Sequence, residues 1–223
     1  MVTPVRVDDD LTLRVDGGRP VSVAAVEAVQ ALCDRAEDHA GPAVVRLLLS
    51  GVPAAGARDG LTVGLVSKWE RAVRRLERLA AVTVAAALGD VGGTALDVLL
   101  AADVRVAVPA ARLVLPLEDG ATWPGMTLYR LAQQAGPVAV RRAALLGEPV
   151  TAAEALALGL VGTLTEDTDA VFASVAAAAA GVSGSEAAIR RQLMFEAGTT
   201  SFEDALGAHL AACDRTLRRA EVR

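Results

Sequence analysis

The pattern of apolar and polar positions is clearest between residues 82 and 108, where long apolar runs are separated by glycines, so the prediction of elements starts there. A β-branched apolar run is followed by closely spaced glycines, by a stretch that is apolar on nearly every side, and by a second apolar run. This order is typical of a buried strand, a tight turn, a buried helix and a second strand. In chain order, the segments are residues 82–87, the glycines Gly89, Gly92 and Gly93, residues 94–102 ended by Asp103, and residues 104–108. Together they predict one parallel βαβ unit at the centre of the molecule.

The segments on either side add short strands and amphipathic helices. Apolar runs predict strands at residues 5–7, 11–15, 43–49 and 161–164, and helical periodicity predicts helices at residues 21–38, 128–135, 137–146 and 170–180. Two capping boxes are expected at helix starts, one at Ser67 and Glu70 and one at Thr151 and Glu154. The helix after Ser67 carries arginines on its outer face, which indicate either solvated surface or an attraction for an anionic ligand or partner.

The C-terminal part is predicted to form two further helices, the first capped by Ser183 and Glu186. One side of the second helix carries a stripe of mostly apolar residues, namely Phe202, Ala205, Leu206, His209, Leu210, Cys213 and Leu217. Such a stripe is too long for a solvated helix, because each large apolar side chain gains by leaving water. The helix is therefore expected either to fold back on the core or to pack against another subunit.

Composition excludes several classes of protein. Hydrophobic residues make up 53% of the 223 residues and charged residues 22%, which predicts a globular chain with one large core. A net charge of −5 without a basic run argues against nucleic acid as the partner. No apolar run is long enough to cross a membrane and the N-terminus does not resemble a signal peptide, so a cytoplasmic protein is expected. The two cysteines lie far apart and the two histidines are isolated, so we expect free thiols and no metal site.

The glycine-rich turn between residues 89 and 93 suggests a site. Backbone N–H groups at the start of a helix, where the helix dipole is positive, suit a phosphate or an oxygen that becomes negative during a reaction. The alternative is a tight strand–helix turn without a ligand. The sequence of the turn leaves both interpretations open.

Several phrases, taken in order, resemble the enoyl-CoA hydratase/isomerase, or crotonase, superfamily. The best of them is LLGEPVTAAEALALGLV at residues 145–161. The others lie at residues 84–89, at 92–103, and at 111–113, Pro116 and 122–125. The resemblance implies an α/β crotonase fold, in which stacked ββα turns form a spiral core domain at residues 1–165. It further implies that residues 166–223 form a helical region that builds trimers or hexamers.

The resemblance also implies a chemistry. Members of the superfamily bind acyl-CoA thioesters and hold the thioester oxygen between two backbone N–H groups, which stabilise an enolate-like anion. One donor falls on Thr94 next to Gly93, and the other on a loop that is shortened here, near Ala55, Gly56 or Ala57. Three further residues are candidates for the wall of the substrate pocket: Leu117, Trp123 and Tyr129. Coenzyme A enters as part of the substrate, and no separate cofactor is implied.

The acid–base residues depart from the pattern of the superfamily, whose hydratases use two glutamates. The first of these glutamate positions is occupied by Asp97, whose side chain is one methylene shorter than that of glutamate. The second is occupied by Leu117, which cannot transfer a proton. Glu118 is a second candidate, although alternate residues of an extended segment face opposite ways. Asp97 has an alternative role, because with Thr94 as the N-cap it stands where a carboxylate caps a helix. The sequence leaves Asp97 open as a cap, a catalyst or both.

Among small members of the superfamily, the chain is most similar to hydratase-like accessory proteins of 3,5-dihydroxyphenylacetyl-CoA formation in glycopeptide antibiotic producers. The phrases that carry this similarity lie at residues 123–136 and 188–196. The resemblance implies a polyketidyl-CoA substrate that loses water, and as partners a type III polyketide synthase and a second, fuller hydratase homologue. The rival interpretation is a non-catalytic accessory protein that acts through its surface. An open cavity at the N–H of Thr94 favours the enzyme, and a filled one favours the accessory protein.

Overall fold

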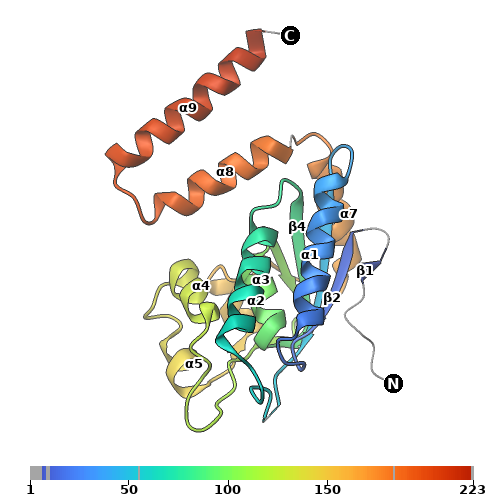
Figure 1. Ribbon diagram of the computed structural model, residues 1–223, viewed down its shortest axis with the longest axis vertical. Coiled ribbons are helices and arrows are strands. Elements are labelled where there is room, and N and C mark those ends of the chain that lie inside the picture. Colours follow the sequence, from blue (N-terminus) through green and yellow to red (C-terminus); the bar gives the residue numbers. More distant parts are fainter. Residues whose placement is uncertain (1–6, 9–10, 55, 183, 222–223) are drawn as a thin grey trace.

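The computed structural model describes residues 7–8, 11–54, 56–182 and 184–221, and its centre is a mostly parallel β-sheet (Figure 1). The strand order is β1-β2-β3-β4-β5-β8, with β6 paired to β4 and β7 paired to β6. Neighbours from β2 to β8 run parallel, whereas the β1–β2 and β6–β7 pairs are antiparallel. The strands are β1 (Val7–Asp8), β2 (Thr12–Asp16), β3 (Val44–Gly51), β4 (Val82–Val91), β5 (Val104–Ala107), β6 (Arg112–Leu113), β7 (Val150–Thr151) and β8 (Thr163–Leu164).

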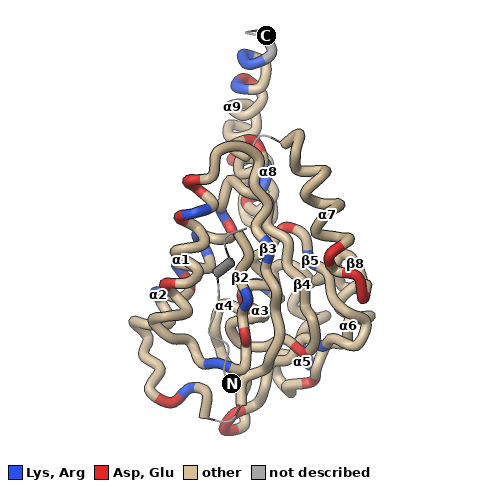
Figure 2. Tube along the Cα trace, turned by 90° about the vertical axis from the view of Figure 1, so that its right-hand side faces the viewer, with Lys and Arg blue, Asp and Glu red and all other residues tan. Residues whose placement is uncertain are grey.

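Helices cover both faces of the sheet. α1 packs on α2 and α2 on α3, while α7 lies against β3, β4 and β5. In Figure 2 the strands stand between α1 and α2 on one side and α7 on the other. The helices are α1 (Val23–Asp38), α2 (Val63–Glu77), α3 (Gly93–Ala101), α4 (Met126–Ala135), α5 (Arg141–Leu146), α6 (Ala152–Ala157), α7 (Thr168–Ala179), α8 (Gly184–Ala197) and α9 (Phe202–Glu221).

The two faces of the sheet follow from the alternation of side chains along its strands. In β4, Ala85 and Ala87 belong to the large core under α1, α2 and α3, whereas Val84 and Ala86 pack in a second cluster with Phe172 of α7. Successive side chains of a strand point to opposite faces, so a strand covered on both faces is apolar at consecutive positions. This burial explains the unbroken apolar run that marks the centre of the sequence.

The predicted βαβ unit is confirmed as β4, α3 and β5, but its first strand is longer than expected. β4 runs to Val91 and includes Gly89, so the prediction that Gly89 ends the strand is wrong. A Cβ atom on Gly89 would meet no atom within 4 Å, so its surroundings do not require a glycine. The chain turns at Gly92, the N-cap of α3, and Gly93 has a φ of +48°, which favours glycine.

Three glycines allow the carboxyl ends of β2, β3 and β4 to approach one another closely. The N–H of Gly17 donates to the carbonyl of Ser50 at 2.7 Å, and the N–H of Gly92 donates to the carbonyl of Gly51 at 2.9 Å. A Cβ atom on Gly17 would lie 2.1 Å from the carbonyl oxygen of Gly92 and 2.5 Å from that of Gly51. Only glycine fits at this junction, and the junction fixes the point at which α3 begins.

The start of α2 corrects one predicted capping box. The helix begins directly after Thr62, whose hydroxyl accepts a hydrogen bond from the N–H of Leu65 at 3.2 Å. Ser67 and Glu70 therefore lie inside α2, and their predicted capping role is wrong. The physical reason is that Thr62 caps the helix more than a turn earlier, so the N–H groups near Ser67 bond to carbonyls within the helix.

The other two predicted caps have different outcomes. At the start of α6, the Thr151 hydroxyl accepts from the N–H of Glu154, and the Glu154 carboxylate accepts from the N–H of Thr151, so this capping box is confirmed. Ser183, the predicted cap of α8, lies outside the described residues. Glu186 stands in the first turn of α8, where its carboxylate pairs with Arg190 at 2.5 Å.

Asp103, which follows α3, also links α8 to the sheet. Its carboxylate accepts hydrogen bonds from the N–H and the hydroxyl of Thr83, both at 2.9 Å. The same carboxylate accepts from two nitrogens of Arg191 on α8, at 2.5 and 2.7 Å. Arg191 is buried and also donates to the carbonyl oxygens of Leu79 and Ala81, just before β4. This network fixes α8 against the segment that leads into the central strand.

α9 projects beyond α8 and does not fold back on the core (Figure 1). Its main packing partner is α8, and ion pairs from Arg215 and Arg219 to Glu186 join the two helices. Phe202 is 76% exposed and Leu217 is 65% exposed. Folding back on the core, one of the two arrangements expected for this stripe, is therefore wrong, while packing against another subunit stays a prediction.

Several smaller expectations can be compared with the described residues. There, no single helix is both long and apolar enough to cross a membrane, and α7 and α8 meet those limits only as a pair bent by 105°. Both cysteines are free as predicted, and burial raises the pKa of Cys33 to about 12. The division of the chain at residue 165 stays a prediction, and α7, which lies beyond it, packs on the sheet.

The glycine junction makes Gly17→Ala a severe substitution. We expect it to lower the free energy of unfolding by about 3 kcal/mol, because the added methyl group overlaps two carbonyl oxygens. Gly89→Ala is the matched control: it adds the same methyl group where no atom lies within 4 Å, and it should change stability by less than about 0.5 kcal/mol. Urea denaturation measures both, and equal stabilities of the two variants would contradict the steric account.

The Asp103 network makes Arg191→Met destabilising. The variant keeps the side chain's length but leaves two carbonyls and a carboxylate without the buried guanidinium, at a cost of about 3 kcal/mol. Arg190→Met is the control, since Arg190 is exposed and pairs with Glu186 within one turn of α8. Thermal melts and limited proteolysis of α8 compare them. Similar melting temperatures would mean that Arg191 does not hold α8 to the core.

Candidate active site

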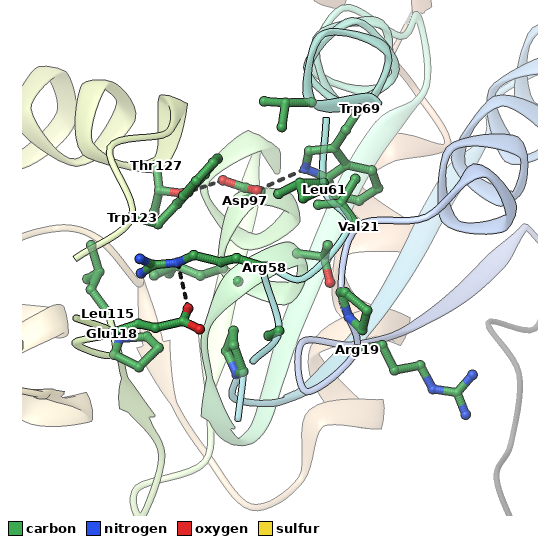
Figure 3. A pocket seen from close by; sticks show the side chains of 18 of the residues that line it. Arg19, Val21, Arg58, Leu61, Trp69, Asp97, Leu115, Glu118, Trp123 and Thr127 are labelled. Atoms are coloured by element: carbon green, nitrogen blue, oxygen red, sulfur yellow. Dashed lines mark hydrogen bonds and ion pairs between the residues drawn. The ribbon is translucent and has the colours of Figure 1, made fainter. Parts of the chain in front are cut away.

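A cavity opens at the carboxyl edge of the sheet, where α3 begins (Figure 3). Its empty volume, including the part open to solvent, is about 970 Å³. Its wall is assembled from the loop after β2, the loop before α2, the cavity-facing side of α2, the first turns of α3 and α4, and the segment after β6. Residues far apart in the sequence therefore meet at one place.

The first turn of α3 presents backbone donors to this cavity. Gly93 and Thr94 both line it. Within the described part of the chain, neither N–H has a hydrogen-bond acceptor, whereas the next two, of Ala95 and Leu96, donate to the carbonyl of Gly92. The first N–H groups of a helix have no partner inside it and lie at the positive end of its dipole. The N–H of Thr94 is therefore available to an oxygen in the cavity, as the oxyanion interpretation requires.

The predicted second donor is engaged elsewhere. Of the three candidates, Ala55 lies outside the described residues. The N–H of Gly56 donates to the Oε1 atom of Glu118 at 2.9 Å, and the N–H of Ala57 donates to the carbonyl of Ala54 at 3.2 Å. Gly56 can serve as an oxyanion donor only after its bond to Glu118 has broken.

Glu118 holds the shortened loop closed from the other side of the cavity. Its Oε2 atom lies 2.8 Å from Nε of Arg58, whose guanidinium stands over the ring of Trp123 at 5.4 Å (Figure 3). The prediction that Leu117 and Glu118 face opposite ways is wrong, since both line the cavity. The reason is a tight turn at Asp119 and Gly120, both with positive φ, in place of an extended strand.

Asp97 is buried at the inner end of the cavity, between α2 and α4 (Figure 3). Its Oδ2 atom accepts from the indole N–H of Trp69 at 2.9 Å, and its Oδ1 atom accepts from the hydroxyl of Thr127. The capping interpretation is wrong, because the N-cap of α3 is Gly92 and the carboxylate of Asp97 bonds to other helices. Burial raises the pKa of Asp97, while the bonds from Thr127 and Trp69 and the charge of Arg130 act in the opposite direction.

Glu70 is a second cavity carboxylate that the sequence analysis missed as a site residue. It follows Trp69 on α2 and lines the cavity. Its Oε2 atom forms an ion pair with Nη1 of Arg130 at 3.0 Å, without hydrogen-bond geometry, and the same nitrogen lies 3.8 Å from Oδ1 of Asp97. Burial raises the pKa of Glu70, as does the negative charge of Asp97, while Arg130 and the backbone of Met126 lower it.

The sequence did contain a signal for Glu70 and Arg130. Glu70 stands at the edge of the apolar stripe of α2, next to Trp69, and Arg130 stands one turn after Thr127 on α4. Residues three apart on a helix share a face, so Thr127 and Arg130 both reach Asp97. Nothing in the sequence shows, however, that α2 and α4 meet across α3.

The three predicted wall residues divide into two groups. Leu117 and Trp123 line the cavity and are partly exposed at its rim. Tyr129 is half exposed on α4 and is not among the described residues that line the cavity, so its assignment to the wall is wrong. The helical period turns Tyr129 away from the face that carries Thr127 and Arg130.

The chain is similar to known proteins along most of its length. The model of the family described as "Enoyl-CoA hydratase/isomerase" matches residues 56–219, more than half of the chain. A protein of Amycolatopsis orientalis named "Enoyl-CoA-hydratase" is 58% identical over 215 residues, which are 96% of this chain and 98% of that protein.

Solved structures share the fold. An enoyl-CoA hydratase/isomerase family protein from Silicibacter pomeroyi matches with a TM-score of 0.77 and 18% identity, over 94% of this chain and 96% of that one. An enoyl-CoA hydratase from Bacillus anthracis matches with a TM-score of 0.76 and 19% identity, over 93% and 87%. These matches confirm the expected α/β crotonase fold. From the family model and the Amycolatopsis relative together, the chain belongs to the enoyl-CoA hydratase/isomerase family, within the crotonase superfamily.

Proposed function

We propose that the cavity binds an acyl-CoA thioester and that the thioester oxygen accepts a hydrogen bond from the N–H of Thr94. The observation that carries this proposal is an open cavity that reaches two backbone N–H groups without acceptors among the described residues, next to the buried carboxylate of Asp97 and the partly buried one of Glu70. Membership in the family supports it, and so does the family name of the Amycolatopsis relative. Coenzyme A is the carrier part of this substrate, and the chemistry requires no separate cofactor.

The chemistry follows from where negative charge develops. Removing a proton from the carbon next to a thioester carbonyl moves an electron pair onto the carbonyl oxygen, which becomes an enolate oxygen. A fixed N–H donor at the positive end of α3 stabilises that oxygen more than the neutral carbonyl of the substrate. A hydroxyl on the next carbon can then leave with a proton as water. The same arrangement also supports migration of a double bond.

The finer form of the proposal is dehydration and aromatisation of a polyketidyl-CoA to 3,5-dihydroxyphenylacetyl-CoA. In this form the chain works with a type III polyketide synthase and a second hydratase homologue. Support comes from the resemblance of residues 123–136 and 188–196 to accessory proteins of that reaction. The leucine at position 117 argues against ordinary two-glutamate hydration.

The alternative function is a non-catalytic accessory protein that stimulates the synthase. The bond between Gly56 and Glu118 favours it, because this bond occupies a donor that a two-donor oxyanion hole would use. The open cavity and the available N–H of Thr94 favour the enzyme. The enzyme would need the N–H groups at the N-terminus of α3 for product formation, whereas the accessory protein would not.

Thr94→Pro tests this difference. Proline is tolerated in the first turn of a helix and removes the N–H, which bonds to no acceptor in α3, along with the threonine side chain. We expect product formation with the synthase and the second homologue to fall by about a hundredfold. Thr94→Ala keeps the N–H and should stay within about threefold of the wild type. Calorimetric titration with phenylacetyl-CoA tests binding. An undetectable heat at millimolar ligand would contradict the proposal that the chain is an acyl-CoA enzyme.

We also propose that the apolar stripe of α9 packs against other copies of the chain, giving a trimer or a hexamer. Burying each large side chain of the stripe contributes about 1.5–3 kcal/mol. Light scattering at micromolar concentration should give an oligomer, and Phe202→Ser combined with Leu210→Ser should give a monomer. Leu145→Ser is the control, because Leu145 is equally exposed but lies on α5. A monomeric wild type would contradict this proposal.

A further inference from the structure

We propose that Glu70 is the catalytic residue that exchanges a proton with the bound thioester, and that Asp97 is a positioning residue behind it. This inference rests on the proposed function, since it assigns the acid–base role within the same cavity. It replaces the expectation that a carboxylate on α3 or on the segment after β6 carries that role. The assignment follows from which carboxylate oxygens can reach a substrate.

Asp97 is held by a hydrogen bond at each of its carboxylate oxygens. One oxygen accepts from Trp69 and the other from Thr127, and the side chain is almost fully buried. Taking up a proton from a substrate would weaken both bonds, because a neutral carboxyl group is a poorer acceptor than a carboxylate. A carboxylate held in this way is a fixed negative charge and an anchor for its neighbours.

Glu70 is held by its ion pair with Arg130 and by the backbone of Met126, and it lines the cavity. Its side chain is 19% exposed, and no described side chain donates a hydrogen bond of normal geometry to its oxygens. Its one ion pair, with Arg130 at 3.0 Å, leaves the other carboxylate oxygen free of that contact. The side chain also projects from a helix, so a change of rotamer can move the carboxylate without breaking the α3 turn.

Two charged side chains and one helix end face Glu70. Asp97 on α3 contributes a negative charge, Arg130 on α4 a positive charge, and the backbone of Met126 marks the N-terminus of α4. Burial and the charge of Asp97 raise the pKa of Glu70, while Arg130 and Met126 lower it. A raised carboxyl pKa suits a group that must both accept and return a proton near neutral pH.

The proposed step balances within the site. The Glu70 carboxylate takes the proton from the carbon next to the thioester carbonyl, so a C–H bond breaks and an O–H bond forms on Glu70. The electron pair of the C–H bond passes to the thioester oxygen, which the N–H of Thr94 stabilises. Return of a proton from Glu70 restores the thioester. In heavy water the proton on Glu70 is replaced by a deuteron, so the thioester gains deuterium.

The other carboxylate in the cavity wall does not fit this role. Glu118 accepts from the N–H of Gly56 and pairs with Arg58, so its two oxygens both hold the shortened loop. Its neighbour Leu117 cannot transfer a proton. Among the carboxylates of the described cavity wall, Glu70 is therefore the one that neither holds a loop nor accepts hydrogen bonds at both oxygens.

The test uses nuclear magnetic resonance in heavy water to measure a rate of exchange. This is the rate at which deuterium replaces hydrogen on the carbon next to the carbonyl of phenylacetyl-CoA. Glu70→Gln should slow this exchange by about a hundredfold or more, with the dissociation constant for phenylacetyl-CoA within about threefold of the wild type. Glu77→Gln is the matched control, because Glu77 is a buried carboxylate on the same helix, pairs with Arg74 and does not line this cavity. Its exchange should be unchanged. Exchange by Glu70→Gln within threefold of the wild type would overturn the assignment.

Asp97→Asn separates positioning from catalysis. Removing its negative charge should lower the pKa of Glu70, so the pH at which the exchange rate falls off in acid should move to a lower value. The exchange rate at high pH should stay within about tenfold of the wild-type rate. A loss of a hundredfold at every pH, with Glu70→Gln near the wild-type rate, would make Asp97 the catalyst. Binding of phenylacetyl-CoA without exchange in the wild type would overturn the inference and leave the proposed binding intact. Absence of binding would instead remove the proposed function.

Discussion

The site depends first on the close backbone contact at Gly17, Gly51 and Gly92. Because the N–H of Gly92 is bonded to the carbonyl of Gly51, the start of α3 is fixed to the end of β3. Pro53 then packs so tightly on Gly93 that a Cβ there would lie 2.7 Å from the proline ring. The N–H groups of Gly93 and Thr94, which have no acceptor in the described part of the chain, are thus placed by closely packed main chain. Such fixed donors suit a site that must stabilise charge without rearranging.

A single buried guanidinium makes the carboxylate pair tolerable. Glu70 and Asp97 come from different helices and would repel each other in a setting with little water. Arg130, from a third helix, lies between them and offsets part of that repulsion. Since the guanidinium is 6% exposed, it has itself lost most of its hydration. These charges therefore link α2, α3 and α4. They also shift the pKa values of Glu70 and Asp97.

The contact between Glu118 and the shortened loop bears on whether the chain is an enzyme or a non-catalytic accessory protein. The loop is held by one hydrogen bond to Gly56, one ion pair to Arg58 and the stacking of Arg58 on Trp123. These contacts are partly exposed, so water and salt weaken them more than they weaken the buried charges. As long as the N–H of Gly56 donates to Glu118, it cannot serve as the second oxyanion donor of the proposed function.

The sequence alone determined the central βαβ unit, the start of α6, the superfamily and the place of Thr94 at a helix start. These features can be predicted from short stretches of sequence, since strand alternation, helix caps and glycine turns are set by neighbours in the chain. It did not determine the length of β4, the start of α2, or the roles of Asp97, Glu118 and Glu70. The roles of the three carboxylates depend on contacts between residues 28 to 62 positions apart, such as Trp69 with Asp97 and Gly56 with Glu118. The start of α2, in contrast, is set by Thr62, a local cap that the sequence analysis overlooked. Only tertiary structure brings such residues together, because the hydrogen bonds and ion pairs that join them act through space and leave no period in the sequence.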